Sequence, residues 1–363
     1  MLTLKTFVVV AAALGAVSGK KAKRQCSSSS SLPEPTSTPA PTEAPTSTET
    51  SVPQPTDLPG SGGGEGASGE YSMTENWVGE SFYDGWDFWA NGDPTHGRVT
   101  YVDGNTAKSQ NLSVTTSDSW IMRADASSTL DPGGPGRNSV RVQSKKSYTT
   151  HVAVLDVAHI PQGPGTWPAY WMCGDNWPYG GEFDIIEGVN DGDTNLSSLH
   201  TGPDCTQPDN GRDMKGHPGA NNCDANASGN QGCGVGFDSN TSFGPSFNQA
   251  GGGYYATERT ETSMKVWFWQ RDDPSVPEEV KSNTGAVSPS TWGTPRALFV
   301  SDSCDLNAKF GPNAFIINLT LCGDWAGNAY PGGMDACNDQ VNNNPSAYTD
   351  AFWDIKRMNV YEK

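Results

Sequence analysis

At residues 181–190 the chain reads Gly181-Glu182-Phe183-Asp184-Ile185-Ile186-Glu187-Gly188-Val189-Asn190. This stretch is apolar and β-favouring except for three carboxylates. Glu182 and Asp184 are two residues apart, so in a strand they share one face. Glu187 lies three residues beyond Asp184 and breaks the period, but a one-residue bulge at Ile185-Ile186 would return it to the same face. Three acids on one face repel each other, which favours a chemical role over a structural one.

Two of these acids have the arrangement that glycoside hydrolysis needs, with carboxyl groups flanking one bond. One carboxyl group protonates the leaving oxygen, and the other attacks the anomeric carbon or activates water. A separation of about 5–5.5 Å between them gives retention of configuration, and a wider one gives inversion. Asp184, between Glu182 and Glu187, can hold a proton near Glu182 and couple to its ionisation. The alternative interpretation is a solvated strand face that happens to carry three acids.

Tryptophans surround the acidic strand in the sequence. Trp167 and Trp171 precede it with the same strand parity, and Trp177 lies five residues before Glu182. Indole rings can stack on the apolar faces of sugars. The chain has 12 Trp, however, so some belong to the core, and Trp167 and Trp171 fit either place. Trp177 and Trp325 lie in loop-like contexts and are the better candidates for a cleft.

The rest of the chain from Tyr71 onward has the pattern of a β-protein. Short alternating or apolar runs recur between Gly, Pro, Asn and Asp turns, at Ser139–Val142, His151–Val157, Met264–Trp269, Ala314–Leu321 and Met358–Tyr361. No long segment with a helical period competes with them. The pattern predicts an all-β fold, an antiparallel sandwich or barrel. His200 falls on the strand after the acidic one, and we expect it beside the carboxylates.

The N-terminal region predicts a secreted protein. Residues 1–18 resemble a signal peptide, with a basic start, a short apolar core and small residues at the cleavage site. Residues 19–70 hold a dibasic processing site, Lys23-Arg24, and a linker rich in Ser, Thr, Pro and Gly that we expect to be disordered. Residues 71–363 form the predicted catalytic domain. We expect the processed protein to be extracellular or associated with the cell wall.

The charge of the chain restricts its partners. The formal net charge is -18, and loss of the five basic residues within residues 1–24 lowers it from -18 by 5 to -23. Such a charge argues against nucleic acid or an anionic membrane as a partner. No stretch is long and apolar enough to span a bilayer. A neutral polysaccharide is compatible with the charge, and we expect a monomer.

Eight cysteines in a secreted chain predict disulfide bonds. Seven of them follow residue 70, so one of the seven is either free or paired with Cys26. Their spacing does not indicate a zinc site. The sequons at Asn111, Asn195, Asn226 and Asn240 lie in polar stretches and are candidate glycan sites. We expect Asn318, inside an apolar strand, to point into the protein or a cleft and to carry no glycan.

The acidic stretch resembles the bulged Glu-x-Asp-x-x-Glu signature of family-16 glycoside hydrolases. Further blocks look like that family's in the same order, at Trp167–Met172, His200-Thr201, Gly252–Ala256, Lys265–Trp269 and Asn318–Gly327. The likeness covers about residues 71–363 and is greatest to fungal endo-1,3(4)-β-glucanases of the laminarinase type. Two positions depart from it, since Phe183 replaces an aliphatic residue and Arg259 stands where Trp is expected. A sugar-binding role of that position would alter subsite preference.

The resemblance implies a β-jelly-roll sandwich of two antiparallel sheets with a concave substrate cleft. It implies a retaining mechanism in which Glu182 is the nucleophile, Glu187 the acid/base and Asp184 the residue assisting Glu182. The residues expected to bind the glucan are Trp167, Trp171, Trp177, His200, Asn190, Asn318 and Trp325. The chemistry needs no cofactor or catalytic metal. A structural calcium ion is compatible with the sequence, although no acidic ligand loop marks a site for it.

Three functions are consistent with these residues. The first is hydrolysis of β-1,3 or mixed β-1,3/1,4 glucans at internal bonds. The second is transglycosylation of wall glucan through the same covalent intermediate; wall-crosslinking members usually carry an unbulged Glu-x-Asp-x-Glu, which ranks this function second. The third is glucan binding without catalysis, which ranks last because both glutamates are present.

Overall fold

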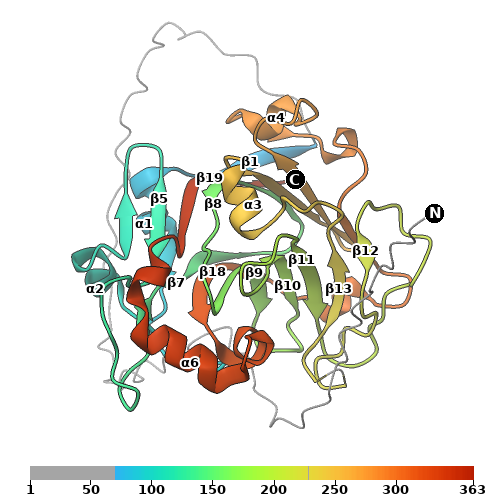
Figure 1. Cartoon of the computed structure of the whole chain (residues 1–363). Helices are drawn as coiled ribbons and strands as arrows, with labels where there is room; N and C mark the ends of the chain where they lie inside the picture. Colours follow the sequence, from blue (N-terminus) through green and yellow to red (C-terminus); the bar gives the residue numbers. More distant parts are fainter. Residues whose placement is uncertain (1–69, 228) are drawn as a thin grey trace, which may run out of the picture.

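Two large antiparallel sheets lie one above the other in the computed structural model, which describes residues 70–227 and 229–363 (Figure 1). The predicted signal peptide, processing site and linker fall outside these residues, as does Cys26. The all-β prediction is confirmed for the described part of the chain. A small parallel pair of strands, β3 (Val99–Tyr101) and β6 (Arg137–Ser139), is an exception to the antiparallel pattern.

The first sheet forms the upper layer in Figure 1. Its strands follow the order β16 (Ala286–Val287), β1 (Tyr71–Trp77), β19 (Phe352–Glu362), β8 (His151–His159), β14 (Gly253–Arg259), β15 (Ser263–Gln270) and β17 (Ala297–Val300). Strand β5 (Trp120–Arg123) pairs with β19, and β4 (Ser113–Thr115) pairs with β5. The first and the last strand of the described residues, β1 and β19, are therefore neighbours in one sheet.

The second sheet carries the acidic strand at its centre. Its strands follow the order β12 (His217–Pro218), β13 (Cys233–Gly236), β11 (Leu196–His200), β10 (Glu182–Glu187), β9 (Thr166–Gly174), β18 (Asn313–Leu321), β7 (Arg141–Tyr148) and β2 (Trp86–Phe88). Strand β10 thus has a backbone partner on each side, β9 and β11. This central position holds its side chains more firmly than an edge strand would.

Helical segments are short and lie at the periphery. They are η1 (Gly79–Ser81), α1 (Phe82–Gly85), α2 (Gly104–Ser109), α3 (Gly244–Gln249), α4 (Glu278–Lys281), η2 (Pro289–Thr291), α5 (Leu306–Lys309), the π-helix η3 (Gly323–Gly327), α6 (Gly333–Asn343) and η4 (Pro345–Tyr348). The longest, α6, follows β18 and η3. Its buried Cys337 forms a disulfide with Cys322 at the end of β18, which attaches this otherwise polar helix to the sheet.

The main core lies between the two sheets, and the opposite face of the second sheet is left for the cleft. In β10, Phe183, Ile185 and Ile186 belong to the main core. In β9, Tyr170 and Met172 also face the core, whereas Trp171 and Cys173 belong to a separate cluster. The alternation along β9 therefore assigns its two faces clearly, one to the core and one to the candidate site.

Candidate active site

Strand β10 contains the predicted bulge. Along β9, Asp184 pairs with Trp171 and Ile186 with Tyr170, so Ile185 is an extra residue between two consecutive partners. Ile185 and Ile186 both pack in the main core. One residue is thereby inserted on the core face, and Glu187 returns to the face that carries Glu182 and Asp184. The three carboxylates share that face, as the sequence indicated.

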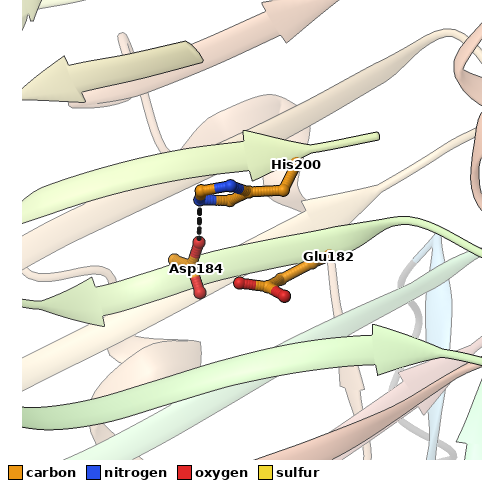
Figure 2. Close-up of side chains that lie close together, drawn as sticks. All are labelled: Glu182, Asp184 and His200. Carbon is orange, nitrogen blue, oxygen red and sulfur yellow. Dashed lines mark ion pairs between the residues drawn. The ribbon is translucent and has the colours of Figure 1, made fainter. Parts of the chain in front are cut away.

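Asp184 lies beside Glu182 and is held by the neighbouring strand. Its Oδ2 accepts a hydrogen bond of 2.9 Å from Ser198 Oγ and lies 3.3 Å from His200 Nε2 (Figure 2). The register of β10 with β11 explains this arrangement, because Asp184 pairs with Ser198 and Glu182 with His200. The predicted place of His200 is confirmed. All of these side chains are nearly fully buried, so the arrangement is shielded from water.

Indole groups donate to both glutamates. Trp177 Nε1 lies 2.5 Å from Glu182 Oε2, and Trp167 Nε1 lies 2.9 Å from Glu187 Oε1. The Trp167 ring also makes an edge contact with Trp325 of η3, with the ring centroids 5.7 Å apart. Each glutamate therefore has a rigid aromatic neighbour that orients it. These contacts place Trp167, Trp177 and Trp325 around the carboxylates rather than in the main core.

A small pocket opens beside Glu187, which forms part of its lining. Its lining includes Trp167, Trp171 and Asn318, so both tryptophans that the sequence left undecided face the cleft. Asn318 Oδ1 accepts a hydrogen bond of 2.8 Å from Trp171 Nε1, and its Nδ2 lies 3.2 Å from the Tyr101 hydroxyl. Asn318 is buried, as the sequence predicted, and its amide holds the Trp171 ring in place.

Sequence reasoning missed two charged residues of this pocket, Arg141 and Asp93. The Arg141 guanidinium lies between two rings, 4.4 Å from the centroid of Trp89 and 5.1 Å from that of Trp171. Asp93 accepts hydrogen bonds from its own loop and from Thr320 Oγ1. Arg141 could have been found from the sequence, because it is a charged residue within the predicted strand Ser139–Val142. Asp93, in an irregular loop, offered none.

Asn190 takes a different place from the one expected for a sugar ligand. Its Oδ1 accepts from Gly165 N at 2.9 Å, and its Nδ2 donates to Ala326 O at 2.8 Å. It thereby joins the turn before β9 to η3, the segment that carries Trp325. These contacts favour a supporting role for Asn190.

Arg259 also lies away from the candidate cleft. Its guanidinium is buried in β14 and donates to Phe310 O at 2.7 Å and Gly311 O at 2.8 Å. Burial lowers its pKa to about 10. The departure from Trp at this position is therefore a packing difference, and the expectation that it could alter sugar subsites has no support in these contacts.

One candidate glycan site is contradicted by burial. Asn195 is 1% exposed, and its side chain binds backbone groups of β10, so the interpretation of this sequon as a glycan site is wrong. The sequence shows a polar stretch, but it does not show that the Asn195 side chain is buried against the backbone of β10. Asn111, Asn226 and Asn240 are exposed, and their glycosylation stays a prediction.

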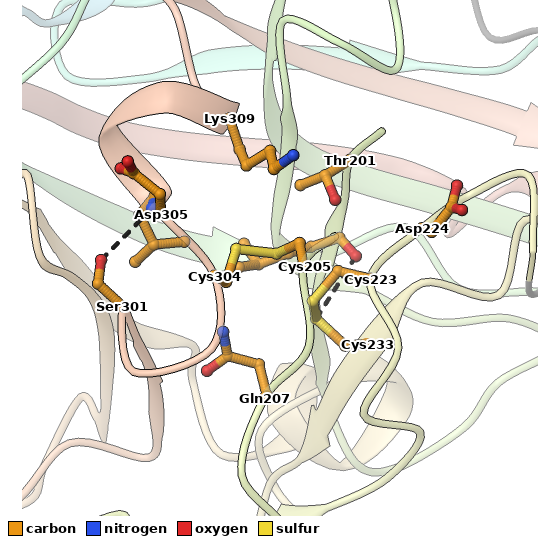
Figure 3. Close-up of a disulfide and its surroundings, with 12 residues drawn as sticks. Thr201, Cys205, Gln207, Cys223, Asp224, Cys233, Ser301, Cys304, Asp305 and Lys309 are labelled. Atoms are coloured by element: carbon orange, nitrogen blue, oxygen red, sulfur yellow. Dashed lines mark hydrogen bonds between the residues drawn. A yellow bond between two sulfur atoms is a disulfide. The ribbon is translucent and has the colours of Figure 1, made fainter. Parts of the chain in front are cut away.

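Disulfides hold the long segment between β11 and β14 next to the site. Cys205 pairs with Cys304 and Cys223 with Cys233 (Figure 3). From this segment Asn230 Oδ1 contacts His200 Nδ1 at 3.1 Å. The cross-links thus stabilise a wall that contacts the histidine of the site.

Within the described residues, one group of acids and histidine is arranged closely enough to hold a metal, and it is Glu182, Asp184 and His200. This is the candidate catalytic group itself, so it provides no separate calcium site. The structural calcium stays a prediction. In the same residues, 70–227 and 229–363, no helix is long and apolar enough to cross a membrane.

Comparison with known proteins assigns the family. Residues 86–361 match the family described as XgeA-like, catalytic GH16 domain.

The chain belongs to glycoside hydrolase family 16.

A curated relative of this family-16 chain is a probable endo-1,3(4)-beta-glucanase from Aspergillus clavatus. The two are 43% identical over 307 residues, which cover 81% of this chain and 47% of the relative. The chain spans about half the length of several such fungal relatives.

Two solved structures of family 16 cover the same part of the chain. Laminarinase 16A from Phanerochaete chrysosporium, with β-glucans in its donor and acceptor sites, is 51% identical, with a TM-score of 0.78 over 80% of this chain and 99% of that one. An elongating family-16 β-1,3-glucosyltransferase is 34% identical, with a TM-score of 0.75 over 80% of this chain and 100% of that one. The jelly-roll sandwich expected from the sequence is therefore confirmed.

Proposed function

We propose that this chain is a secreted endo-β-1,3(4)-glucanase that cleaves internal bonds of β-1,3 or mixed β-1,3/1,4 glucans with retention of configuration. The observation that carries the proposal is the bulge in β10, which brings Glu182, Asp184 and Glu187 to one face beside indole groups. The names of relatives support it, since several are endo-1,3(4)-β-glucanases or laminarinases. Disulfide bonds are compatible with secretion.

The proposed reaction has two displacements. In the first, the Glu182 carboxylate attacks the anomeric carbon, the bond to the leaving oxygen breaks, and Glu187 gives that oxygen its proton. In the second, Glu187 takes a proton from water, the water oxygen bonds to the anomeric carbon, and Glu182 leaves as carboxylate. No cofactor takes part.

The surrounding residues orient these groups. Trp177 Nε1 holds one oxygen of Glu182, and Trp167 Nε1 holds one oxygen of Glu187. Asp184, oriented by Ser198 and His200, lies close enough to Glu182 to couple to its ionisation. Trp325, which is only partly buried, offers apolar surface for sugar rings. Rigid placement of this kind lowers the entropic cost of reaching the transition state.

The decisive variant is Glu182→Gln, assayed on laminarin and on lichenan. We expect turnover to fall by several orders of magnitude, because the nucleophile is lost while the shape is kept. Glu258→Gln is the matched control, since Glu258 is a buried carboxylate of the other sheet. Substantial activity in Glu182→Gln would refute the nucleophile assignment. The anomer released first, followed by NMR, tests retention, and the ratio of products from the two glucans tests linkage preference.

Transglycosylation is the second candidate. It is favoured by the similarity to the elongating β-1,3-glucosyltransferase. The two functions share Glu182 and Glu187 and differ in whether water or a sugar hydroxyl attacks the intermediate. Incubation with a labelled acceptor oligosaccharide separates them, because a transglycosylase lengthens the label whereas a hydrolase leaves it unextended at low acceptor concentration. Glucan binding with no product from either assay would instead favour a binding protein.

A further inference from the structure

The bulge in β10 removes part of its backbone pairing with β11. The two strands pair from Glu182 with His200 to Asp184 with Ser198, and the pairing ends there. Beyond that point the carbonyl of Ile185 and the N–H of Glu187 face β11 without a backbone partner from that strand. Buried backbone groups without partners are costly. Another group must therefore bind them for the bulge to be stable.

Two side chains, one just before β11 and one near its start, bind these groups. Asn195 Oδ1 accepts from Glu187 N at 3.0 Å, and Asn195 Nδ2 donates to Ile185 O at 2.8 Å. Ser197 Oγ donates to the same carbonyl at 2.9 Å. Asn195 and Ser197 are 1% and 0% exposed, so water cannot easily replace them. One amide thus reproduces the donor and the acceptor that a regular strand would have offered.

The backbone of Asn195 is held in turn by the segment after β13. Asn195 N donates to Ser242 Oγ at 2.9 Å, and Asn195 O accepts from Phe237 N at 2.9 Å. Phe243, next to Ser242, packs against Gly188 so tightly that a Cβ added at Gly188 would lie 2.6 Å from its ring. The segment after β13 therefore fixes Asn195 and the residue after Glu187 together.

We propose that Asn195, assisted by Ser197, is a positioning residue that keeps Glu187 directed into the cleft. The inference rests on the proposed role of Glu187 as acid/base. A one-residue slip of a strand turns its side chains to the opposite face. Without the Asn195 amide the bulge can relax, and Glu187 then leaves its contact with Trp167. The sequon at Asn195 consequently stays unmodified, because a glycan would occupy the nitrogen that binds Ile185.

The test compares Asn195→Ala with Glu187→Ala on laminarin and on a dinitrophenyl β-laminaribioside, with and without azide. An activated leaving group needs no proton, and azide attacks the glycosyl-enzyme without a general base. We expect Asn195→Ala to lose about 10²-fold in kcat on laminarin, the cost of misplacing a reacting group by about 1 Å. KM should change less than kcat, and azide should raise turnover of the activated glycoside, as with Glu187→Ala.

Asn248→Ala is the matched control. The side-chain amide of Asn248, in α3, accepts from Ile160 N and donates to Ile160 O, both at 2.9 Å. Like Asn195, it binds a backbone N–H and a backbone carbonyl, but it does so away from β10. It should lower stability without an azide response. Full kcat in Asn195→Ala, or loss of kcat without azide rescue, would overturn the inference. If azide failed to raise the turnover of Glu187→Ala, the proposed role of Glu187 as the acid/base would be refuted. The positioning role of Asn195, which rests on it, would then be refuted as well.

Three further measurements keep the inference testable if Asn195→Ala fails to fold. Ser197→Ala removes one of two donors to Ile185 O, and we expect a roughly threefold to tenfold loss of kcat with the same azide response; wild-type kcat would contradict it. Asn195→Asp keeps the acceptor for Glu187 N and loses the donor to Ile185 O. Its kcat should therefore lie between those of Asn195→Ala and Ser197→Ala. Mass spectrometry of the Asn195 peptide should show no glycan, and a glycan there would also refute the inference.

Discussion

Burial of the three acids decides between the two interpretations of the acidic stretch. Glu182, Asp184 and Glu187 are 0%, 0% and 3% exposed, so they do not form a solvated strand face. Buried carboxylates are costly unless hydrogen-bonded, and each of these has a donor within hydrogen-bonding distance. The structure tolerates three costly groups in one place, which is typical of an active site rather than of packing.

His151 provides a prediction for the pH dependence of stability. Burial between Tyr148 and Phe315 lowers its pKa from 6.5 to about 3, and nearby Arg259 acts in the same direction. Between these values the unfolded chain binds a proton that the folded protein does not, so the free energy of unfolding falls as pH falls from 6.5 towards 3. His151→Asn should reduce the slope by up to about 1.4 kcal/mol per pH unit.

Urea unfolding at several pH values between 4 and 6 measures this slope. The exposed His217 gives the control, and His217→Asn should leave the slope as in the wild type. An unchanged slope in His151→Asn would show that carboxylates alone cause the acid sensitivity.

At the level of elements, β10 is positioned by supports on both of its ends. Asn195 binds the bulge near its C-terminal end. At the other end, Asn313 Nδ2 donates to Gly181 O at 2.9 Å, directly before Glu182, and Arg259 binds Asn313 in turn. Strand β14 of the other sheet therefore helps to position β10 through two side chains.

Arg259→Met tests this connection. The change leaves the carbonyls of Tyr148, Phe310 and Gly311 without their guanidinium donor, and we expect a loss of about 2–4 kcal/mol in the free energy of unfolding. The distribution of product lengths from laminarin should stay as in the wild type. Arg271→Met, which removes a less buried guanidinium from Asp156, should cost less. A changed product distribution without loss of stability would indicate a sugar-binding role instead.

At the scale of the whole molecule, the disulfides connect segments far apart in sequence. Cys205 and Cys304 are 99 residues apart, and their bond joins the segment after β11 to the one before α5. A cross-link that closes such a long loop typically stabilises a fold by about 2–5 kcal/mol. The predicted disulfide framework is thus confirmed for the described cysteines, and each of them is bonded.

Cys173 yields the last prediction. It is disulfide-bonded and pairs in register with Glu182, while the six other cysteines after residue 70 bond among themselves. Cys26 is the remaining cysteine of the sequence. We expect non-reducing peptide mapping of the secreted protein to find Cys26 joined to Cys173 in a monomer. A dimer that separates on reduction, and that is absent in Cys173→Ser, would contradict this pairing.

The sequence predicted the fold class and the acidic strand because both depend on local periodicity. Prediction from the sequence failed for features that depend on contacts between segments far apart in the chain. Helix α6 was not predicted because most of its residues are polar. Only Met334, Cys337 and Val341 join the apolar cluster that contains Leu319 and Leu321, and the Cys322–Cys337 disulfide completes the attachment. Asn195 was misinterpreted because a sequon has the same letters whether it is exposed or buried.

By itself, then, the sequence indicated the residues that we propose to carry the chemistry, and it predicted the bulge that brings them to one face. The alternation of side chains along a strand is a local property, and one extra isoleucine suffices to change it. Only the tertiary structure decided what holds them there. The partner of Trp171 is Asn318, 147 residues away, and the bulge is bound by side chains from the next strand. Such contacts depend on which strands become neighbours, and this is decided by packing of the whole chain.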